Sequence, residues 1–180
     1  LGHDIEIVAG REEARLIYLG VAHSLADDAG QRLVVDIGGG STELIIGERF
    51  ESTETESLHM GCVSFAQRFF ADGSITEKAF DRAVTAARQE VLSIHANYRR
   101  LGWLQAVGAS GTIKAISQVC VDNGWSETGI TMEGLKKARK KVIKAGKVEQ
   151  LDLKGLREDR RAIFPSGLAI LYGIFEQLSI

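Results

Sequence analysis

The most informative part of this sequence reads Leu33-Val34-Val35-Asp36-Ile37-Gly38-Gly39-Gly40-Ser41-Thr42-Glu43-Leu44-Ile45-Ile46. An apolar run that ends in glycines is typical of a buried strand followed by a tight turn. A second apolar run follows at once, so the pattern predicts two consecutive strands joined by the glycines. Three successive glycines cost conformational entropy on folding, and close approach of the backbone to an anion is the usual reason for them.

The polar residues beside the glycines favour a phosphate site. Ser41 and Thr42 add hydroxyl donors. Asp36 and Glu43 flank the loop with carboxylates that suit a divalent cation next to a phosphate. The pattern is neither the P-loop nor the dinucleotide-binding fingerprint, because no Lys-Ser/Thr pair follows and the next element is a strand. A hairpin turn without a ligand is the alternative.

Five segments in the same order resemble the exopolyphosphatase / guanosine pentaphosphate phosphatase family of the actin-like ATPase superfamily. They are Gly10-Arg11-Glu12-Glu13-Ala14-Arg15-Leu16-Ile17, Asp36-Ile37-Gly38-Gly39-Gly40-Ser41-Thr42-Glu43, Met60-Gly61-Cys62-Val63-Ser64-Phe65, Gly108-Ala109-Ser110-Gly111-Thr112 and Phe164-Pro165-Ser166-Gly167-Leu168-Ala169-Ile170-Leu171. The resemblance implies an α/β, ribonuclease H-like (actin-like) domain with a mixed sheet flanked by helices. It also implies that residues 1–180 are one domain, the second of a longer enzyme, without the first actin-like domain and the C-terminal region.

The resemblance assigns roles to individual residues. The second glutamate of Glu12-Glu13, which is Glu13, becomes the catalytic base that activates water. Mg²⁺ is the implied cofactor, held by Asp36 and Glu43 directly or through water. The implied phosphate-binding residues are Gly38, Gly39, Gly40, Ser41 and Thr42 of the first loop and Gly108, Ser110, Gly111 and Thr112 of the second.

Each of these assignments has an ordinary structural alternative. Acids in the first turn of a helix favour its dipole, which would explain Glu12 and Glu13 without chemistry. A helix that opens after the second loop would need a cap, and either Ser110 or Thr112 would supply it.

The predicted activity is release of terminal phosphate from inorganic polyphosphate, with guanosine pentaphosphate as the alternative substrate of the same family. We lean towards polyphosphate from the general run of residues 10–16 and 60–67. Two further alternatives are an actin-like kinase, which would transfer phosphate from ATP to an acceptor, and a binding domain that senses a phosphorylated alarmone without turnover. The absent first domain is an expected partner, and the isolated chain is expected to be inactive.

Composition fits a cytoplasmic globular domain. The chain is 44% hydrophobic and 26% charged, and its net charge of −2 leaves no overall footprint for nucleic acid. No apolar run approaches the roughly 18 residues of a membrane span. Cys62 and Cys120 lack metal-type spacing, which favours reduced thiols, and the four histidines are scattered and are interpreted as structural or surface residues.

The pattern predicts strands at residues 5–9, 32–37, 42–48, 51–59 and 105–107, the fourth of them by chain order at an edge of the sheet. It predicts helices at residues 10–24, 76–101, 111–121, 132–145 and 157–178, with Thr131 as one N-cap and an interruption near Pro165.

Three of these helices carry open questions. The heptad-like spacing in residues 76–101 allows a homodimer as well as packing on the chain's own sheet. Residues 135–147 contain seven Lys/Arg and no acid, which fits a solvated face or a guide for a polyanion. The helix at residues 10–24 is apolar on two sides, with Leu16 and Leu19 away from the main stripe, so we expect a second surface, from the absent domain, to cover it.

Overall fold

The computed structural model describes residues 8–25 and 30–180. The strand predicted at residues 5–9 therefore lies mostly outside the described residues, and Val8 and Ala9 are not in a strand.

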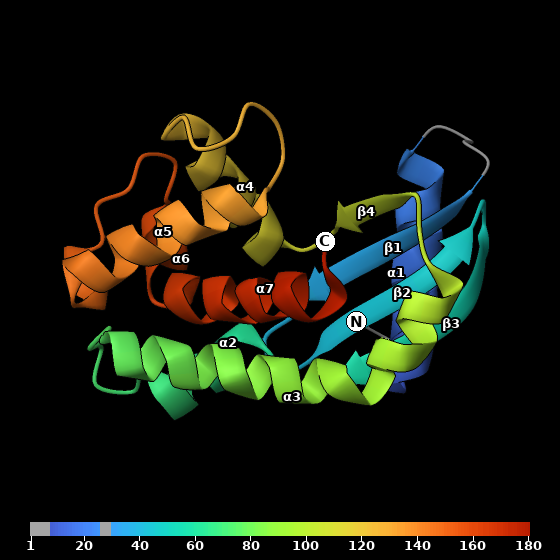
Figure 1. The fold of residues 1–180 in the computed structure, drawn as a ribbon, viewed down its shortest axis with the longest axis horizontal. Helices are drawn as coiled ribbons and strands as arrows, with labels where there is room; N and C mark the ends of the chain where they lie inside the picture. The colour runs from blue at the N-terminus through green and yellow to red at the C-terminus, as the bar shows by residue number, and fades with distance from the viewer. Residues whose placement is uncertain (1–7, 26–29) are drawn as a thin grey trace, which may run out of the picture.

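A mixed four-stranded sheet forms the centre of the molecule, with the strand order β3-β2-β1-β4 (Figure 1). Its strands are β1 (Gln31–Ile37), β2 (Thr42–Glu48), β3 (Glu51–Leu58) and β4 (Gln105–Gly108). The first three are antiparallel neighbours joined by short turns, whereas β4 pairs parallel to β1 after a long crossover. The polar β3 lies at the edge of the sheet, as the sequence predicts.

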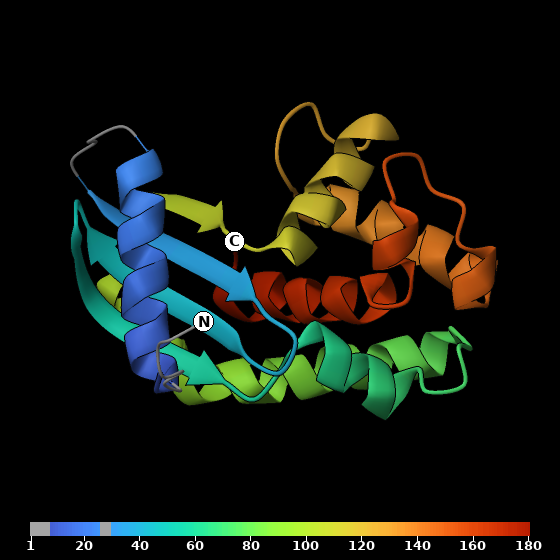
Figure 2. The same cartoon turned by 180° about the vertical axis from the view of Figure 1, so that it is seen from behind.

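Helices cover both faces of the sheet. Helix α1 (Gly10–Ser24) lies across one face, and α3 (Glu77–Leu101) and α7 (Phe164–Leu178) lie on the other (Figures 1 and 2). Successive side chains of a strand point to opposite faces. Val34 and Ile45 accordingly pack against Ala14 and Tyr18 of α1, whereas Leu33, Val35 and Ile37 belong to the larger core on the other side.

Helix α7 is the centre of that larger core. It is apolar on nearly every side and is buried along most of its length. The other helices of this layer pack around it: α2 (Cys62–Phe69), α3, α4 (Gly111–Asp122), α5 (Met132–Ala145) and the short α6 (Glu158–Arg161), while a 3-10 turn, η1 (Val148–Gln150), follows α5. No helix of the described ranges is long and apolar enough to span a membrane.

Most predicted elements are confirmed within one or two residues. Thr131 caps α5 by accepting a hydrogen bond from the Gly134 amide, and the helix predicted at residues 157–178 is two helices, α6 and α7. Pro165 lies in the first turn of α7, where the absence of an N–H group removes no intrahelical hydrogen bond. The apolar stripe of α3 packs against α7 and β3 within the chain, so its spacing requires no second copy. Helix α2 was not predicted.

Candidate functional site

Two of the three glycines of the β1–β2 loop, Gly39 and Gly40, are not explained by the backbone of the loop, whereas a Cβ atom on Gly38 would lie a tight 3.2 Å from the Ser41 carbonyl oxygen. Type I′ and II′ hairpin turns require positive φ angles, and none of Gly38, Gly39 and Gly40 has a left-handed φ. A Cβ atom on Gly40 would meet nothing within 4 Å, and one on Gly39 would make an ordinary 3.5 Å contact with Val63. The fold itself would therefore accept a side chain at residues 39 and 40.

The N-terminus of α2 holds the carbonyl groups of this loop. The Cys62 amide donates to the Gly38 carbonyl at 2.9 Å, and the Val63 amide donates to the Gly39 carbonyl at 2.9 Å. A trans peptide points its N–H opposite to its C=O, so the amides of Gly39 and Gly40 point away from α2. Within the described part of the chain these two amides donate to no acceptor, and both glycines are exposed.

Gly61 allows this approach of α2 to the loop. A Cβ atom on Gly61 would collide with the backbone of Gly39 and Gly40. The contact is reinforced by the buried Thr42, whose hydroxyl donates to the Met60 carbonyl. The loop and the start of α2 are therefore one packed unit, which lies at one end of the sheet (Figure 2).

Not every predicted phosphate-binding group of the first loop is free. The Gly38 amide donates to the Ser41 carbonyl at 2.9 Å and closes the hairpin. The Thr42 hydroxyl is used in its bond to Met60. The amides of Gly39 and Gly40 and the half-exposed Ser41 are the groups of the loop that remain open to a ligand.

Two carboxylates lie beside the loop on the α1 face of the sheet. Asp36 and Glu43 are paired in register across β1 and β2, and Glu43 is paired in turn with Ser57 of β3. Glu43 is only 2% exposed and accepts a 2.8 Å hydrogen bond from the Ser57 hydroxyl. Burial raises the pKa of Asp36, and the charges of Glu43 and then Glu13 raise it further. The three carboxylates therefore share one electrostatic environment.

The structure distinguishes Glu12 from Glu13. Arg15 donates three hydrogen bonds to the Glu12 carboxylate, at 2.7, 2.9 and 3.1 Å, and these bonds lower the pKa of Glu12. The carboxylate of Glu13 has no hydrogen-bond or ion-pair partner in residues 8–25 and 30–180. Glu13 lies close enough to Asp36 to influence its pKa, so it is the glutamate of the pair that faces the other acids.

The second loop is joined to the first through Ser110. Its hydroxyl accepts hydrogen bonds from the Ile113 amide at 3.3 Å and from the Ile37 amide at 3.2 Å, so it caps α4 and fixes the helix to the end of β1. Thr112 is buried, and its hydroxyl lies 3.5 Å from the Cys62 sulfur. The capping alternative thus holds for Ser110.

The first turn of α4 offers an anion the amides of Gly111 and Thr112. Neither donates to an acceptor in the described ranges, and the turn contains no acid that would oppose a bound anion. A hollow of about 470 Å³ lies between α1 and this region, and Asp36, Gly108 and Lys114 line it.

Sequence reasoning missed one cation at this loop, Arg160 of α6. A Cβ atom on Gly111 would lie 3.1 Å from the Arg160 guanidinium, and the carboxylate paired with Arg160 is that of Asp159 at a loose 3.7 Å. The sequence offers no signal for this contact, because about fifty positions separate the two residues and no spacing rule connects them.

The last of the five segments, residues 164–171, packs beneath the two loops in the core. The buried Ser166 hydroxyl donates to the Cys62 carbonyl at 2.6 Å, and Gly167 has no room for a Cβ atom beside Thr112. These contacts fix Cys62, which bonds to the first loop, and Thr112, which lies in the second. All five segments that carry the sequence resemblance therefore meet at this end of the sheet.

The Ppx/GppA phosphatase family matches the chain over residues 1–180. Curated relatives named guanosine-5'-triphosphate,3'-diphosphate pyrophosphatase are 47% identical in Aliivibrio fischeri, 48% in Vibrio cholerae and 47% in Aeromonas hydrophila. Each of these alignments covers 100% of this chain and 36% of the relative. The chain thus spans little more than a third of the length of these relatives.

Solved structures confirm the fold. The Aquifex aeolicus PPX-GPPA enzyme superposes with a TM-score of 0.77 at 24% identity, over 99% of this chain and 60% of that one. An exopolyphosphatase from Cytophaga hutchinsonii superposes with a TM-score of 0.79 at 22% identity, over 98% of this chain and 59% of that one. The predicted actin-like architecture is therefore confirmed.

Proposed function

This chain belongs to the Ppx/GppA phosphatase family, and we propose that it supplies one wall of an active site that hydrolyses a phosphoanhydride bond of guanosine 5′-triphosphate 3′-diphosphate. The observation that carries the proposal is the pair of outward-pointing amides at Gly39 and Gly40, on glycines that the fold itself does not require. The names of the relatives at 47–48% identity favour this substrate over inorganic polyphosphate, the substrate that the sequence alone predicts.

The phosphate groups would bind between the two loops. The amides of Gly39 and Gly40 form one set of donors, and those of Gly111 and Thr112 at the start of α4 form the other. Arg160 adds a positive charge beside the second set. Preorganised donors of this kind stabilise negative charge on a transferring phosphoryl group more in the transition state than in the ground state. Ser110 and the hydroxyls of Thr42 and Thr112 position the loops and do not contact the substrate in this proposal.

Asp36 and Glu43 fit a role as ligands of Mg²⁺. They lie opposite each other on adjacent strands, and no ion pair neutralises either one within the described residues. The described ranges contain no group of three or more His, Cys, Asp or Glu side chains that could hold a metal ion, so water and substrate phosphate oxygens would have to complete the coordination of Mg²⁺ at Asp36 and Glu43. When bound, Mg²⁺ would neutralise charge on the phosphate oxygens.

Glu13 is the candidate general base. Its carboxylate would accept a proton from a water molecule as the water oxygen attacks phosphorus and the bond to the bridging oxygen breaks. Glu12 is less suited to this role, because its hydrogen bonds to Arg15 stabilise the charged form and lower its basicity.

The proposal is tested by phosphate release from the full-length protein with Mg²⁺. We expect guanosine 5′-triphosphate 3′-diphosphate to be hydrolysed with a higher kcat/KM than inorganic polyphosphate, and we expect Gly40→Val to abolish turnover of both without lowering Tm. A higher kcat/KM for polyphosphate would return the assignment to exopolyphosphatase. Full activity of Gly40→Val would remove the loop from the active site.

A further inference from the structure

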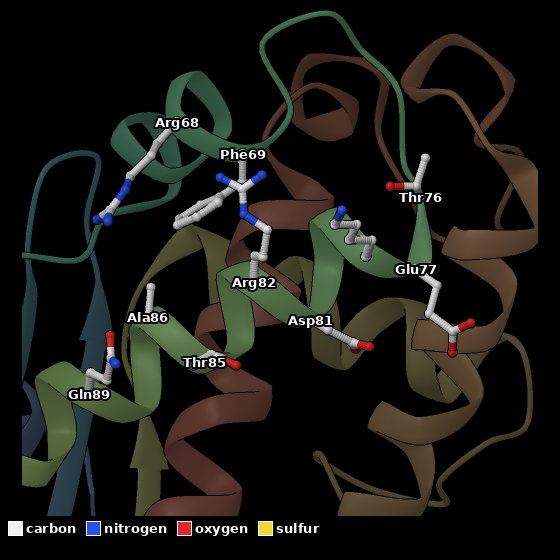
Figure 3. Close-up of a pocket in the computed structure, with 10 residues that line it drawn as sticks. Arg68, Phe69, Thr76, Glu77, Asp81, Arg82, Thr85, Ala86 and Gln89 are labelled. Carbon is white, nitrogen blue, oxygen red and sulfur yellow. The ribbon is translucent and has the colours of Figure 1, made fainter.

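The buried Glu43 is held by a hydroxyl group. Glu43 is 2% exposed, and its Oε1 atom accepts a 2.8 Å hydrogen bond from the Ser57 hydroxyl. Two acids on α3 show a different arrangement. Glu77 and Asp81 line a groove of about 860 Å³ between α2 and α3 (Figure 3), and both bond to Arg139, at 3.1 and 2.8 Å. A hydroxyl orients a carboxylate without supplying a positive charge, so a metal ion can still supply that charge at Glu43.

The bond to Ser57 occupies only one oxygen of the Glu43 carboxylate. An ionised carboxylate has two acceptor oxygens, so Oε2 of Glu43 can contact a ligand while Oε1 is held. Glu43 lies opposite Asp36 in the register of β1 and β2. Carboxylates that bind metals are themselves oriented by hydrogen bonds, and loss of such a bond weakens metal binding. Ser57 is therefore in the right place to orient Glu43 for a metal ion.

Helix α1 leaves room for Ser57 because residue 10 is a glycine. A Cβ atom on Gly10 would lie 2.8 Å from both the Cβ and the Oγ atoms of Ser57, well inside the usual contact distance. Gly10 does not have a left-handed φ, and alanine would favour the helix more. The close approach to Ser57 is therefore the constraint that requires a glycine at this position.

The same approach fixes the first turn of α1 on the sheet. Gly10 and Glu13 both lie in this turn. Arg11 of the same turn forms a 2.9 Å ion pair with Glu56, the residue before Ser57 in β3. The turn that carries the candidate base thus rests on the hydroxyl that orients Glu43.

We propose that Ser57 is a positioning residue of the metal site, whose hydroxyl fixes the Glu43 carboxylate for Mg²⁺, and that Gly10 provides the space for it. The inference rests on the proposed function, in which Asp36 and Glu43 are the Mg²⁺ ligands. Ser57 itself contacts neither the metal ion nor the substrate. Its removal therefore weakens the binding of Mg²⁺ and leaves the chemical step intact once Mg²⁺ is saturating.

The test measures how much Mg²⁺ the full-length protein requires. Mg²⁺ is titrated first without substrate, with the rise in Tm as the readout, and then with guanosine 5′-triphosphate 3′-diphosphate, with kcat as the readout. Ser57→Ala should raise the half-maximal Mg²⁺ concentration roughly 10–100-fold in both titrations, and its kcat should approach that of the parent at saturating Mg²⁺.

Thr55→Ala is the matched control. Thr55 lies two residues before Ser57, on the same face of β3, and it is paired with Ile45 instead of Glu43. This variant should require as much Mg²⁺ as the parent.

A second pair of variants tests the role of Gly10. Gly10→Ala should raise the Mg²⁺ requirement of the parent, because the added Cβ atom displaces the Ser57 hydroxyl. In a Ser57→Gly background the two atoms that this Cβ meets are absent, so the same substitution should have little further effect. An equal effect in both backgrounds would show that Gly10 does not act through Ser57.

Two results would overturn the role of Ser57. One is an unchanged Mg²⁺ requirement in Ser57→Ala, and the other is a loss of kcat that saturating Mg²⁺ does not restore. Failure of the proposed function looks different, because the parent itself would then show neither a Mg²⁺-dependent Tm nor hydrolysis, and this inference would fall with it. Should Gly10→Ala fail to fold, Ser57→Ala decides alone, since it removes one hydroxyl from a half-buried residue and adds no atom.

Discussion

At the scale of single residues, the adjacent glutamates of α1 differ in role, since Glu12 forms an ion pair on the surface and Glu13 is the candidate general base. Glu12 is bound by Arg15, whereas Glu13 lies near Asp36 and has no such partner in the described ranges. We expect Glu13→Gln to lower kcat by roughly 10²–10⁴-fold, the range for a lost general base, with little change in KM. Steady-state kinetics of the full-length enzyme would measure both parameters.

Glu12→Gln is the matched control for that experiment. It alters the neighbouring residue of the same type and removes an exposed surface ion pair, which contributes little to stability because solvent screens it. Its kcat should stay close to that of the parent. A larger loss of kcat in Glu12→Gln than in Glu13→Gln would contradict the assignment of the base.

The raised pKa of Asp36 makes the stability of the protein depend on pH. Burial, then Glu43 and then Glu13 raise its pKa on folding. A carboxyl whose pKa is raised on folding contributes stability at low pH, and this contribution is lost as the pH rises through the folded pKa. In the presence of a chelator, Asp36→Asn should therefore raise Tm at about pH 8, and the increase should shrink towards about pH 4, near the ordinary carboxyl pKa.

The same variant tests the metal site without an activity assay. Mg²⁺ stabilises a protein that binds it in the folded state, so it should raise the Tm of the parent and raise that of Asp36→Asn less. An equal Mg²⁺-dependent shift of Tm in both proteins would count against Asp36 as a metal ligand. A lower Tm for the variant at about pH 8 in the presence of a chelator would instead contradict the raised pKa of Asp36.

At the scale of elements, the β1–β2 loop and the start of α2 form one packed unit. In this unit Gly61 is required for packing, whereas Gly40 is required only for the proposed anion site. A Cβ atom on Gly61 would collide with the loop backbone, whereas one on Gly40 would meet open space. Gly61→Ala should cost roughly 1–3 kcal/mol of stability, the usual range for overpacking. Gly40→Val should leave Tm nearly unchanged and abolish phosphate binding, because its branched side chain occupies the place of the anion.

Chemical denaturation and phosphate titration of the two glycine variants separate these effects. Gly39→Val should resemble Gly40→Val in losing phosphate, although its contact with Val63 is closer. Unchanged phosphate affinity in Gly40→Val would show that the loop is only a turn.

The sequence predicted those elements whose pattern is long enough to be periodic. Helices α1 and α5 and strand β2 have the predicted bounds, because apolar spacing and turn residues agree there. Helix α2 has eight residues, of which only Cys62 and Phe65 are buried, so it contains too few turns to show a period.

For the candidate site, the sequence predicts less than it does for the fold. It locates both loops, but it does not show which hydroxyl groups form structural hydrogen bonds and which remain open to a ligand. Serine and threonine suit a cap, a structural bond and a ligand equally well, and only the structure shows that Ser110 caps α4 and that Thr42 bonds to Met60. The Arg160 contact depends on tertiary packing alone.

At the scale of the whole molecule, α1 has one face on the sheet and one face open. Ala14 and Tyr18 are buried against the sheet, whereas Leu16 on another side of the helix is 46% exposed. The curated relatives are nearly three times as long as this chain, since it spans 36% of them. We therefore propose that another part of the longer protein covers Leu16 and closes the site against water, which strengthens its electrostatic interactions.

This arrangement predicts that Leu16→Ser has different effects in two contexts. In the isolated 180-residue chain, where Leu16 is already exposed, the substitution should leave the free energy of unfolding almost unchanged. In the full-length protein it should cost roughly 1 kcal/mol, because about half of a leucine side chain loses its apolar cover, and it should lower kcat.

Leu92→Ser is the control, since Leu92 is 60% exposed on α3. Its effect should be small and equal in both contexts. Denaturant unfolding of the four variants and their parents gives the difference. An effect of Leu16→Ser that is the same in both contexts, or robust hydrolysis by the isolated chain, would show that the site closes without a second surface over α1.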